Sequence, residues 1–157
     1  MRKIYHTSSP KLLALGLIFF SIIFSTAAFA NQYRKQQNIR VLLKQARDAW
    51  VARDANALAQ IFAPDGELIV PGKRWHGQAE IREEVSRFAQ QSTDVKIEIR
   101  RIIVEGNQAV VEWYYEDTEK ATGLCHKADD AIIVDFKDGH ISRWREYFDD
   151  KTLASKS

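Results

Sequence analysis

The spacing of apolar residues changes along the chain, from every three or four positions to every second position. The helical spacing is kept by Ile39, Leu42, Leu43, Ala46 and Trp50, and it predicts an amphipathic helix. Asp54 interrupts the pattern and is expected to cap a short helix over residues 55–62. A third helix is predicted to begin at residue 77, because Ile81, Val85 and Phe88 share one side of it.

Alternating residues predict an antiparallel sheet in the rest of the chain. The expected strands cover residues 67–70, 95–104, 108–116, 123–136 and 141–148. Residues 64–66 are expected to form a turn, and Trp75 and His76 are placed in a loop before the third helix. Helices followed by a long antiparallel sheet are typical of an α+β domain whose sheet curls over helices on one side.

Residues 1–30 have the pattern of a secretory signal peptide. Basic residues precede the 13-residue apolar run Leu12–Phe24, and small residues then lead to Ala28-Phe-Ala30. The 19 uncharged residues 12–30 also approach the length of a membrane span, so an uncleaved inner-membrane anchor is the alternative. Both interpretations place the folded part outside the cytoplasm, in the periplasm or cell envelope. We expect residues 31–37 to be a tether, 38–150 the domain and 151–157 a flexible tail.

Charge and composition exclude several classes of function. Three of the 23 basic and none of the 21 acidic residues lie in segment 1–30, so the remainder has a net charge of −1. Without a basic stripe, nucleic acid is not an expected partner. The chain has no Cys cluster, no His pair at metal-ligand spacing and no glycine-rich phosphate loop, so no metal or cofactor is predicted. The single cysteine, Cys125, is expected to be a small half-buried residue or a thiol open to an intermolecular bridge.

Glu146 in the closing strand is the leading candidate for chemistry. It shares a strand face with Trp144 and Phe148. A carboxylate between two aromatic residues is either a structural residue on a mixed surface or a group that points into an apolar pocket. In a pocket, desolvation would raise its pKa toward the range useful for acid/base catalysis. His126 and Asp130 share one face of the preceding strand and are the further candidates for proton transfer.

Bulky side chains are expected to line a cavity under the sheet. Four tryptophans are more than the surface of so small a chain requires, although core packing is the alternative for each. The predicted pocket-lining residues are Trp50, Phe62, Trp75, Phe88, Trp113, Tyr115, Ile132, Val134, Trp144 and Phe148.

Several motifs together resemble one known family. They are Trp50-x3-Asp54, Ile61-Phe-Ala-Pro-Asp65, Pro71-Gly72, His76-Gly77-x3-Ile81-Arg82, Val111-Glu-Trp113 and Asp138-Gly-x-Ile141 followed by Arg145-Glu-Tyr-Phe-Asp149. In this order they resemble the SnoaL-like domains, a branch of the NTF2-like superfamily, over about residues 38–150. The resemblance implies an α+β cone with a curved, mostly antiparallel sheet, a deep cavity, and often a homodimer packed through the outer sheet face. It does not imply one reaction, because the fold hosts isomerases, cyclases, hydrolases and non-catalytic binders.

The catalytic residues of ketosteroid isomerase-like relatives are not found at the corresponding positions of this chain. Their carboxylate base falls at Val70, and their oxyanion-hole residues fall near Ala46 and Ile132.

Other relatives match in part. Limonene epoxide hydrolase-like members have an aspartate that Glu146 matches, but their supporting Arg and Asp fall near Trp113 and Tyr115. Polyketide cyclase-like members use a His–Asp pair, for which His126 and Asp130 are the candidates.

Two functions of different class therefore remain. The first is an exported domain that binds a small apolar or aromatic molecule in a conical pocket. The second is an isomerase, cyclase or hydrolase that uses Glu146 with His126 or Asp130 for proton transfer. A pure dimerisation module without a cavity is a third option. The expected partners are a small-molecule ligand and a second copy of the chain, and membrane contact is expected only through an uncleaved N-terminal segment.

Overall fold

A computed structural model describes the backbone of residues 10–149 and the side chains of residues 28–149. The chain divides into two compact units, residues 1–35 and 36–157. Helix α1, Pro10–Ala52, runs through the division, so the expected tether at residues 31–37 is helical. Most of the predicted signal peptide, residues 1–27, and the tail 151–157 lie outside the described side chains. No helix among the described residues is long and apolar enough to cross a membrane.

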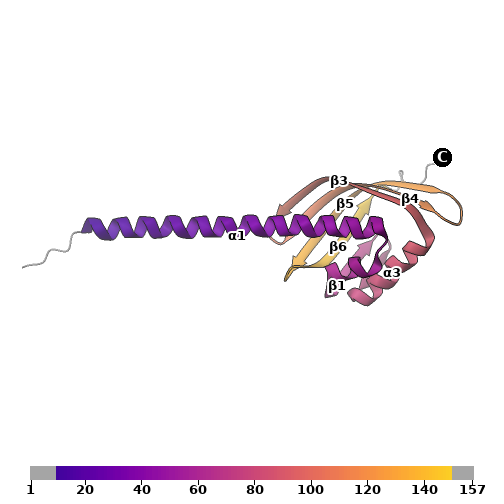
Figure 1. Ribbon diagram of the computed structural model, residues 1–157, viewed down its shortest axis with the longest axis horizontal. Helices are drawn as coiled ribbons and strands as arrows, with labels where there is room; N and C mark the ends of the chain where they lie inside the picture. The colour runs from indigo at the N-terminus through magenta and orange to yellow at the C-terminus, as the bar shows by residue number, and fades with distance from the viewer. Residues whose placement is uncertain (1–9, 150–157) are drawn as a thin grey trace, which may run out of the picture. The chain divides into compact units, whose positions relative to one another are not determined.

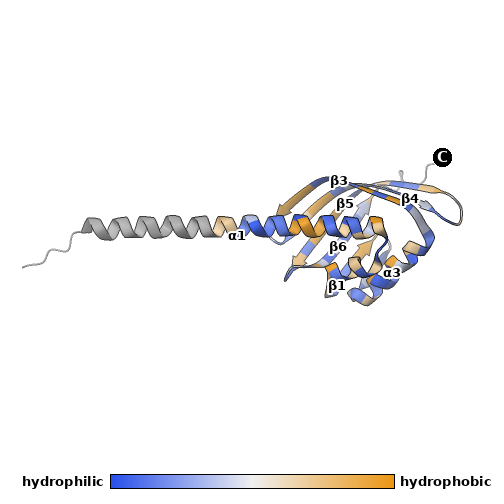
Figure 2. Ribbon diagram, in the orientation of Figure 1, coloured by the Kyte–Doolittle hydropathy of each residue, from blue (hydrophilic) through white to orange (hydrophobic). Residues whose placement is uncertain are grey.

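The second unit contains the three predicted helical segments. Helix α1 contributes its residues from 36 onward, and α2, Ala55–Ile61, and α3, Gly77–Gln91, follow. Asp54 caps α2 as predicted, because its Oδ1 accepts the N–H groups of Asn56 and Ala57 at 3.0 and 2.9 Å. Apolar side chains of each helix are buried, including Leu43, Leu58 and Ile81. Along α3 the few hydrophobic positions are separated by hydrophilic ones (Figure 2).

Six strands form one curved, open sheet around these helices (Figure 1). In chain order they are β1 Phe62–Val70, β2 Lys73–His76, β3 Ser92–Glu105, β4 Gln108–Glu119, β5 Cys125–Lys137 and β6 His140–Phe148. The spatial order is β2-β1-β6-β5-β4-β3. The pair β1·β6 is parallel and the other pairs are antiparallel. The predicted α+β class with a mostly antiparallel sheet is confirmed.

Two local predictions were wrong. The segment 73–76 is not a loop but strand β2, which pairs with β1 through Leu68 and Trp75. The predicted turn at residues 64–66 lies within β1, where the register against β6 shifts between Phe62 and Glu67. Pairing with β1 makes residues 73–76 extended, whereas residues 64–66 lie in the interrupted part of the β1·β6 ladder.

The two faces of the sheet differ in burial. On β4 and β5 the buried positions Val111, Trp113, Ile132 and Val134 alternate with exposed or half-buried ones. These buried side chains join those of the helices in a single core cluster. The concave face therefore covers the helices, and the site described next lies within this face.

Candidate functional site

A cavity of about 630 Å³ opens within the concave face of the sheet. Helices α1 and α3 contribute to its wall, and strands β4, β5 and β6 supply most of its polar groups. Its lining residues are Trp50, Val70, Lys73, Phe88, Gln91, Ser92, Trp113, Tyr115, Asp117, Glu119, Leu124, His126, Asp130, Glu146 and Phe148.

Asp130 is a buried carboxyl group of this lining. Its side chain comes from β5, and the residue is 6% exposed. The indole N–H of Trp113, the cross-strand neighbour on β4, donates to Oδ2 at 2.6 Å. Burial raises the pKa of Asp130 to about 6, against the lowering effect of this hydrogen bond, and the charge of Asp129 adds to the rise.

Glu146 is held in the same way on β6. The indole N–H of Trp144 donates to its Oε1 at 2.7 Å. The two indole rings lie against each other, with centroids 5.4 Å apart and planes tilted by 49°. Burial, the largest cause, and the charge of Asp130 together raise the pKa of Glu146 to about 7, against the lowering effect of the hydrogen bond from Trp144. Two carboxyl groups that titrate near neutral pH therefore share the cavity.

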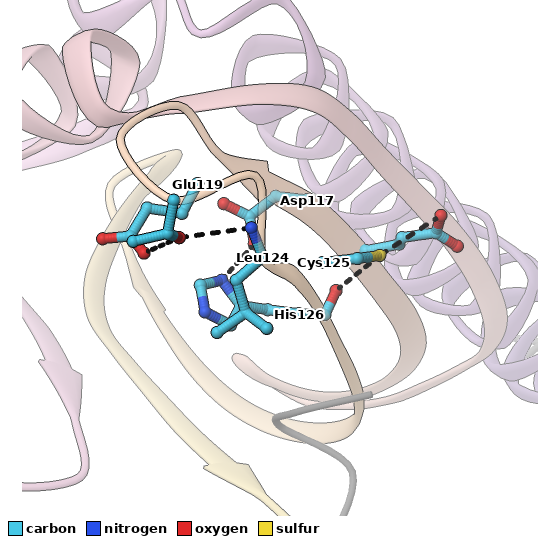
Figure 3. A network of polar contacts seen from close by, with 7 residues as sticks. Asp117, Glu119, Leu124, Cys125 and His126 are labelled. Carbon is cyan, nitrogen blue, oxygen red and sulfur yellow. Dashed lines mark hydrogen bonds and ion pairs between the residues drawn. The ribbon is translucent and has the colours of Figure 1, made fainter. Parts of the chain in front are cut away.

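A His–Asp pair lies farther along β4 and β5. His126 Nδ1 lies 3.0 Å from Oδ1 of Asp117, its cross-strand partner (Figure 3). The other ring nitrogen of His126 points away from Asp117. Asp117 is 3% exposed. Tyr115 separates this pair from Trp113 along β4, and burial raises its pKa, to which the charge of Asp117 adds.

The structure brings eight of the predicted site residues to the cavity. All three proton-transfer candidates line it, as do five aromatic residues, Trp50, Phe88, Trp113, Tyr115 and Phe148.

The other predicted pocket residues lie elsewhere. Phe62, Ile132, Val134 and Trp144 are packed in the core with at most 1% exposure, although Trp144 reaches Glu146 through its indole nitrogen. Trp75 is partly buried on β2 and is not in the cavity lining. Alternation along a strand predicts the face of a side chain, but it does not tell whether the space in front of that side chain is filled.

The predicted pairing of His126 requires a correction. His126 is paired with Asp117, whereas Asp130 is bonded to Trp113. Asp117 was not among the predicted site residues, although it shares one strand face with Trp113 and Tyr115. Its partner depends on the β4·β5 register, which the sequence pattern leaves open.

Val70, where a ketosteroid isomerase-like base would be, lines the cavity. Ala46 and Ile132, at the oxyanion-hole positions, are completely buried. The structure thus places no carboxyl or phenol group at these three positions.

Three other polar residues lie outside the lining of this cavity. His76 and His140 are exposed, and Cys125 is half-buried with its Sγ 3.8 Å from Oε1 of Glu116. Among the described residues, no group of three or more His, Cys, Asp or Glu side chains is arranged to hold a metal ion.

Known proteins share this architecture. A family model described as a SnoaL-like domain matches residues 43–144. No curated protein sequence matches the chain.

Solved structures match over most of their length. A hypothetical protein with a ketosteroid isomerase-like fold from Catenulispora acidiphila, in complex with trimethylamine, is 19% identical with a TM-score of 0.67, covering 71% of this chain and 88% of that one. An LEH-like epoxide hydrolase from M. tuberculosis is 19% identical with a TM-score of 0.66, covering 75% and 86%. An NTF-2 like protein of unknown function from Burkholderia xenovorans is 25% identical with a TM-score of 0.59, covering 73% and 85%.

Proposed function

Because the chain belongs to the SnoaL-like domain family and has an NTF2-like fold, we propose that its cavity binds a small apolar or aromatic molecule. The cavity itself carries this proposal. Its volume of about 630 Å³ and its five aromatic side chains are typical of small-molecule sites, in which a few polar groups orient an otherwise apolar ligand. The Catenulispora neighbour, which was solved in complex with the small organic molecule trimethylamine, is in keeping with this role.

The test is to look for the ligand and then to fill the cavity. We expect native mass spectrometry of the protein isolated from its own cells to show a bound molecule of defined mass. Val70→Phe adds bulk to the cavity lining and should abolish that mass shift, whereas Val110→Phe, at a position 42% exposed on the opposite sheet face, should retain it. The proposal fails if no molecule is retained and a panel of aromatic compounds leaves the fluorescence of Trp50 and Trp113 unchanged.

A second candidate function is acid/base catalysis, and the two carboxyl groups with raised pKa values favour it. With pKa values of about 6 and about 7, Asp130 is largely ionised at neutral pH while Glu146 is about half protonated. Asp130 would then accept a proton from carbon next to a carbonyl group, and protonated Glu146 would donate to the carbonyl oxygen, giving an enol. The M. tuberculosis epoxide hydrolase shows that this fold also supports hydrolysis.

Turnover separates the two candidates. A screen of unsaturated ketones and epoxides is expected to give a product only if the domain is an enzyme. In that case Glu146→Gln and Asp130→Asn should each abolish turnover while a bound ligand is still retained. If no substrate turns over, the binding role stands alone.

We further propose that the domain is exported and pairs with a second copy. The sequence of residues 1–30 supports export, and cleavage after Ala30 would give a mature chain that begins at Asn31. Mass spectrometry of the purified protein tests this, because an uncleaved anchor retains residues 1–30.

Exposed aliphatic residues on the convex face of the sheet support the proposed pairing of two copies of the chain. Ile103, Val110 and Ile133 are neighbours across β3, β4 and β5, and they are 54%, 42% and 38% exposed. A row of exposed aliphatic side chains favours contact with another protein surface.

A further inference from the structure

The cavity carries an excess of negative charge. Four carboxyl groups line it, those of Asp117, Glu119, Asp130 and Glu146. Among the described residues of its lining, Lys73 is the single side chain with a permanent positive charge, and His126 is engaged by Asp117. A ligand with a negative charge is therefore repelled, and a ligand with a positive charge is attracted.

Asp130, a residue of the lining, supplies a buried acceptor in the wall of this cavity. Its Oδ2 receives the indole N–H of Trp113, but its Oδ1 is buried without a hydrogen-bond partner among the described residues. An unmatched buried acceptor destabilises the empty site, so a ligand that donates to it gains affinity. Because an ionised carboxylate can only accept, a ligand that satisfies Oδ1 must donate an N–H or O–H group.

The aromatic walls favour a charged donor over a neutral one. The rings of Trp50 and Phe88 meet edge to face with centroids 5.4 Å apart, and Tyr115 and Phe148 lie in the same lining. Faces of aromatic rings attract cations, most strongly where water is excluded. A neutral alcohol would satisfy Oδ1 of Asp130 but would gain neither cation–π attraction from the rings nor attraction from the surplus charge.

We propose that the ligand of this cavity is a protonated amine, whose ammonium N–H donates to Oδ1 of Asp130 while its apolar body lies against the aromatic walls. This inference rests on the binding function proposed above and names the chemical class of the ligand. A quaternary ammonium group satisfies the charge but has no hydrogen for Oδ1, so the amine must carry at least one N–H.

The test compares molecules of equal size and different charge. Benzylamine and 2-phenylethylamine are titrated into the purified full-length chain by calorimetry at pH 8, beside benzyl alcohol, 2-phenylethanol and benzoate. Each amine is expected to bind at least about tenfold more tightly than its alcohol, because its donor is charged whereas that of the alcohol is neutral, and benzoate should bind weakest.

Matched variants assign the preference to one carboxylate. Asp130→Asn keeps the shape of the side chain and is expected to lower amine affinity by about tenfold, with little effect on the alcohols. Glu112→Gln is the control, because that carboxylate is 45% exposed and pairs with Arg101 on the other face. Equal affinity for amine and alcohol, or an unchanged amine affinity in Asp130→Asn, overturns the inference but leaves the binding function intact. Failure of every compound to bind overturns both.

A pH series on the unaltered protein gives an independent readout. Lowering the pH from 8 to 5 protonates Asp130, whose pKa is about 6, and should weaken amine binding by about tenfold. Protonation of Glu146, whose pKa is about 7, acts in the same direction. The other titratable groups of the lining are Asp117, Glu119, His126, Lys73 and Tyr115. Amine affinity that is constant over this range contradicts the proposal.

Discussion

At the scale of single residues, two carboxyl groups of the cavity, those of Asp130 and Glu146, are each held by an indole rather than by a base. Trp113 and Trp144 donate one hydrogen bond each, to Asp130 and Glu146. A neutral donor orients a carboxyl group without neutralising it, whereas a lysine or arginine partner would lower its pKa strongly. The charge of these groups therefore remains available to a ligand or substrate.

Glu146→Gln is expected to change how stability depends on pH. A carboxyl group whose pKa in the folded state, about 7, exceeds its ordinary value of 4.5 stabilises the fold while it keeps its proton. This contribution is lost as the pH rises toward 7, by on the order of 3 kcal/mol. Gln does not titrate but still accepts from Trp144, so the variant should gain stability relative to the wild type between pH 5 and pH 8.

Urea unfolding at the two pH values measures this difference. Glu112→Gln is a suitable control, because Glu112 lies in an outward pair with Arg101 at 3.5 Å. A variant with the same pH dependence as the wild type would show that Glu146 is not desolvated.

Trp113→Phe tests the hydrogen bond to Asp130. The change leaves both oxygens of a buried carboxylate unmatched, so we expect a loss of about 1–3 kcal/mol in the free energy of unfolding. It should also raise the pKa of Asp130 above about 6, because the Trp113 bond lowers that pKa. An NMR titration of the Asp130 carboxyl carbon measures the second effect, which loss of packing alone would not produce.

Trp75→Phe provides the comparison, since Trp75 is partly buried outside the cavity lining. It is expected to leave the titration of Asp130 unchanged. A similar pKa in Trp113→Phe and in the wild type would contradict the assigned role of the indole.

The site residues that the sequence predicts need the pattern of a single strand, whereas those it misses need the register between two strands. Glu146 and Phe148 follow from alternation in a single strand, and both line the cavity. The Asp117–His126 pair needs the register of two strands joined by residues 120–124, and that register depends on loop geometry rather than on side-chain type. Trp144 alternates along its strand as a pocket residue would, yet neighbouring side chains bury it almost completely. It reaches the site only through its hydrogen bond to Glu146.

At the scale of elements, β1 is the least regular part of the sheet and the hardest to predict. Phe62 pairs with β6, the ladder is interrupted until Glu67, and the second half of β1 then pairs with β6 on one side and with β2 on the other. Strands β3 to β6 are long and alternate, so their patterns predict them well. A strand of four residues such as β2 has too few positions for alternation to be recognised.

Gly66→Ala is expected to disturb the interruption in β1. A Cβ at this position would lie 2.9 Å from the carbonyl oxygen of Ile141 and 3.1 Å from that of Ala63. Both contacts are with backbone, so the strands must move apart, and we expect a loss of about 1–3 kcal/mol in unfolding free energy. Hydrogen exchange should accelerate in β1 and β6 and stay unchanged in β3 and β4. An alanine variant as stable as the wild type would show that the two strands have room at this point.

At the scale of the whole molecule, the convex side of the sheet is mostly charged around one apolar row. The pair Arg101–Glu112 joins β3 and β4, and Arg143–Asp135 joins β6 and β5. Between these pairs run Ile103, Val110 and Ile133, at one level of the sheet. Exposed salt bridges contribute little to stability, so they act mainly on solubility and on the choice of partner.

Val110→Glu is expected to weaken self-association without unfolding the domain. If two copies meet through this row, a carboxylate at its centre would be buried without a partner, which costs several kcal/mol in the dimer and almost nothing in the monomer. Sedimentation velocity should show a concentration-dependent dimer for the wild type and a monomer for the variant. Glu105→Gln, at an exposed position beside the row, should still dimerise. Because Val110 faces away from the cavity, ligand binding that persists in the monomeric variant would show that the site is complete within one chain. A wild type that stays monomeric at all concentrations would contradict the proposed dimer.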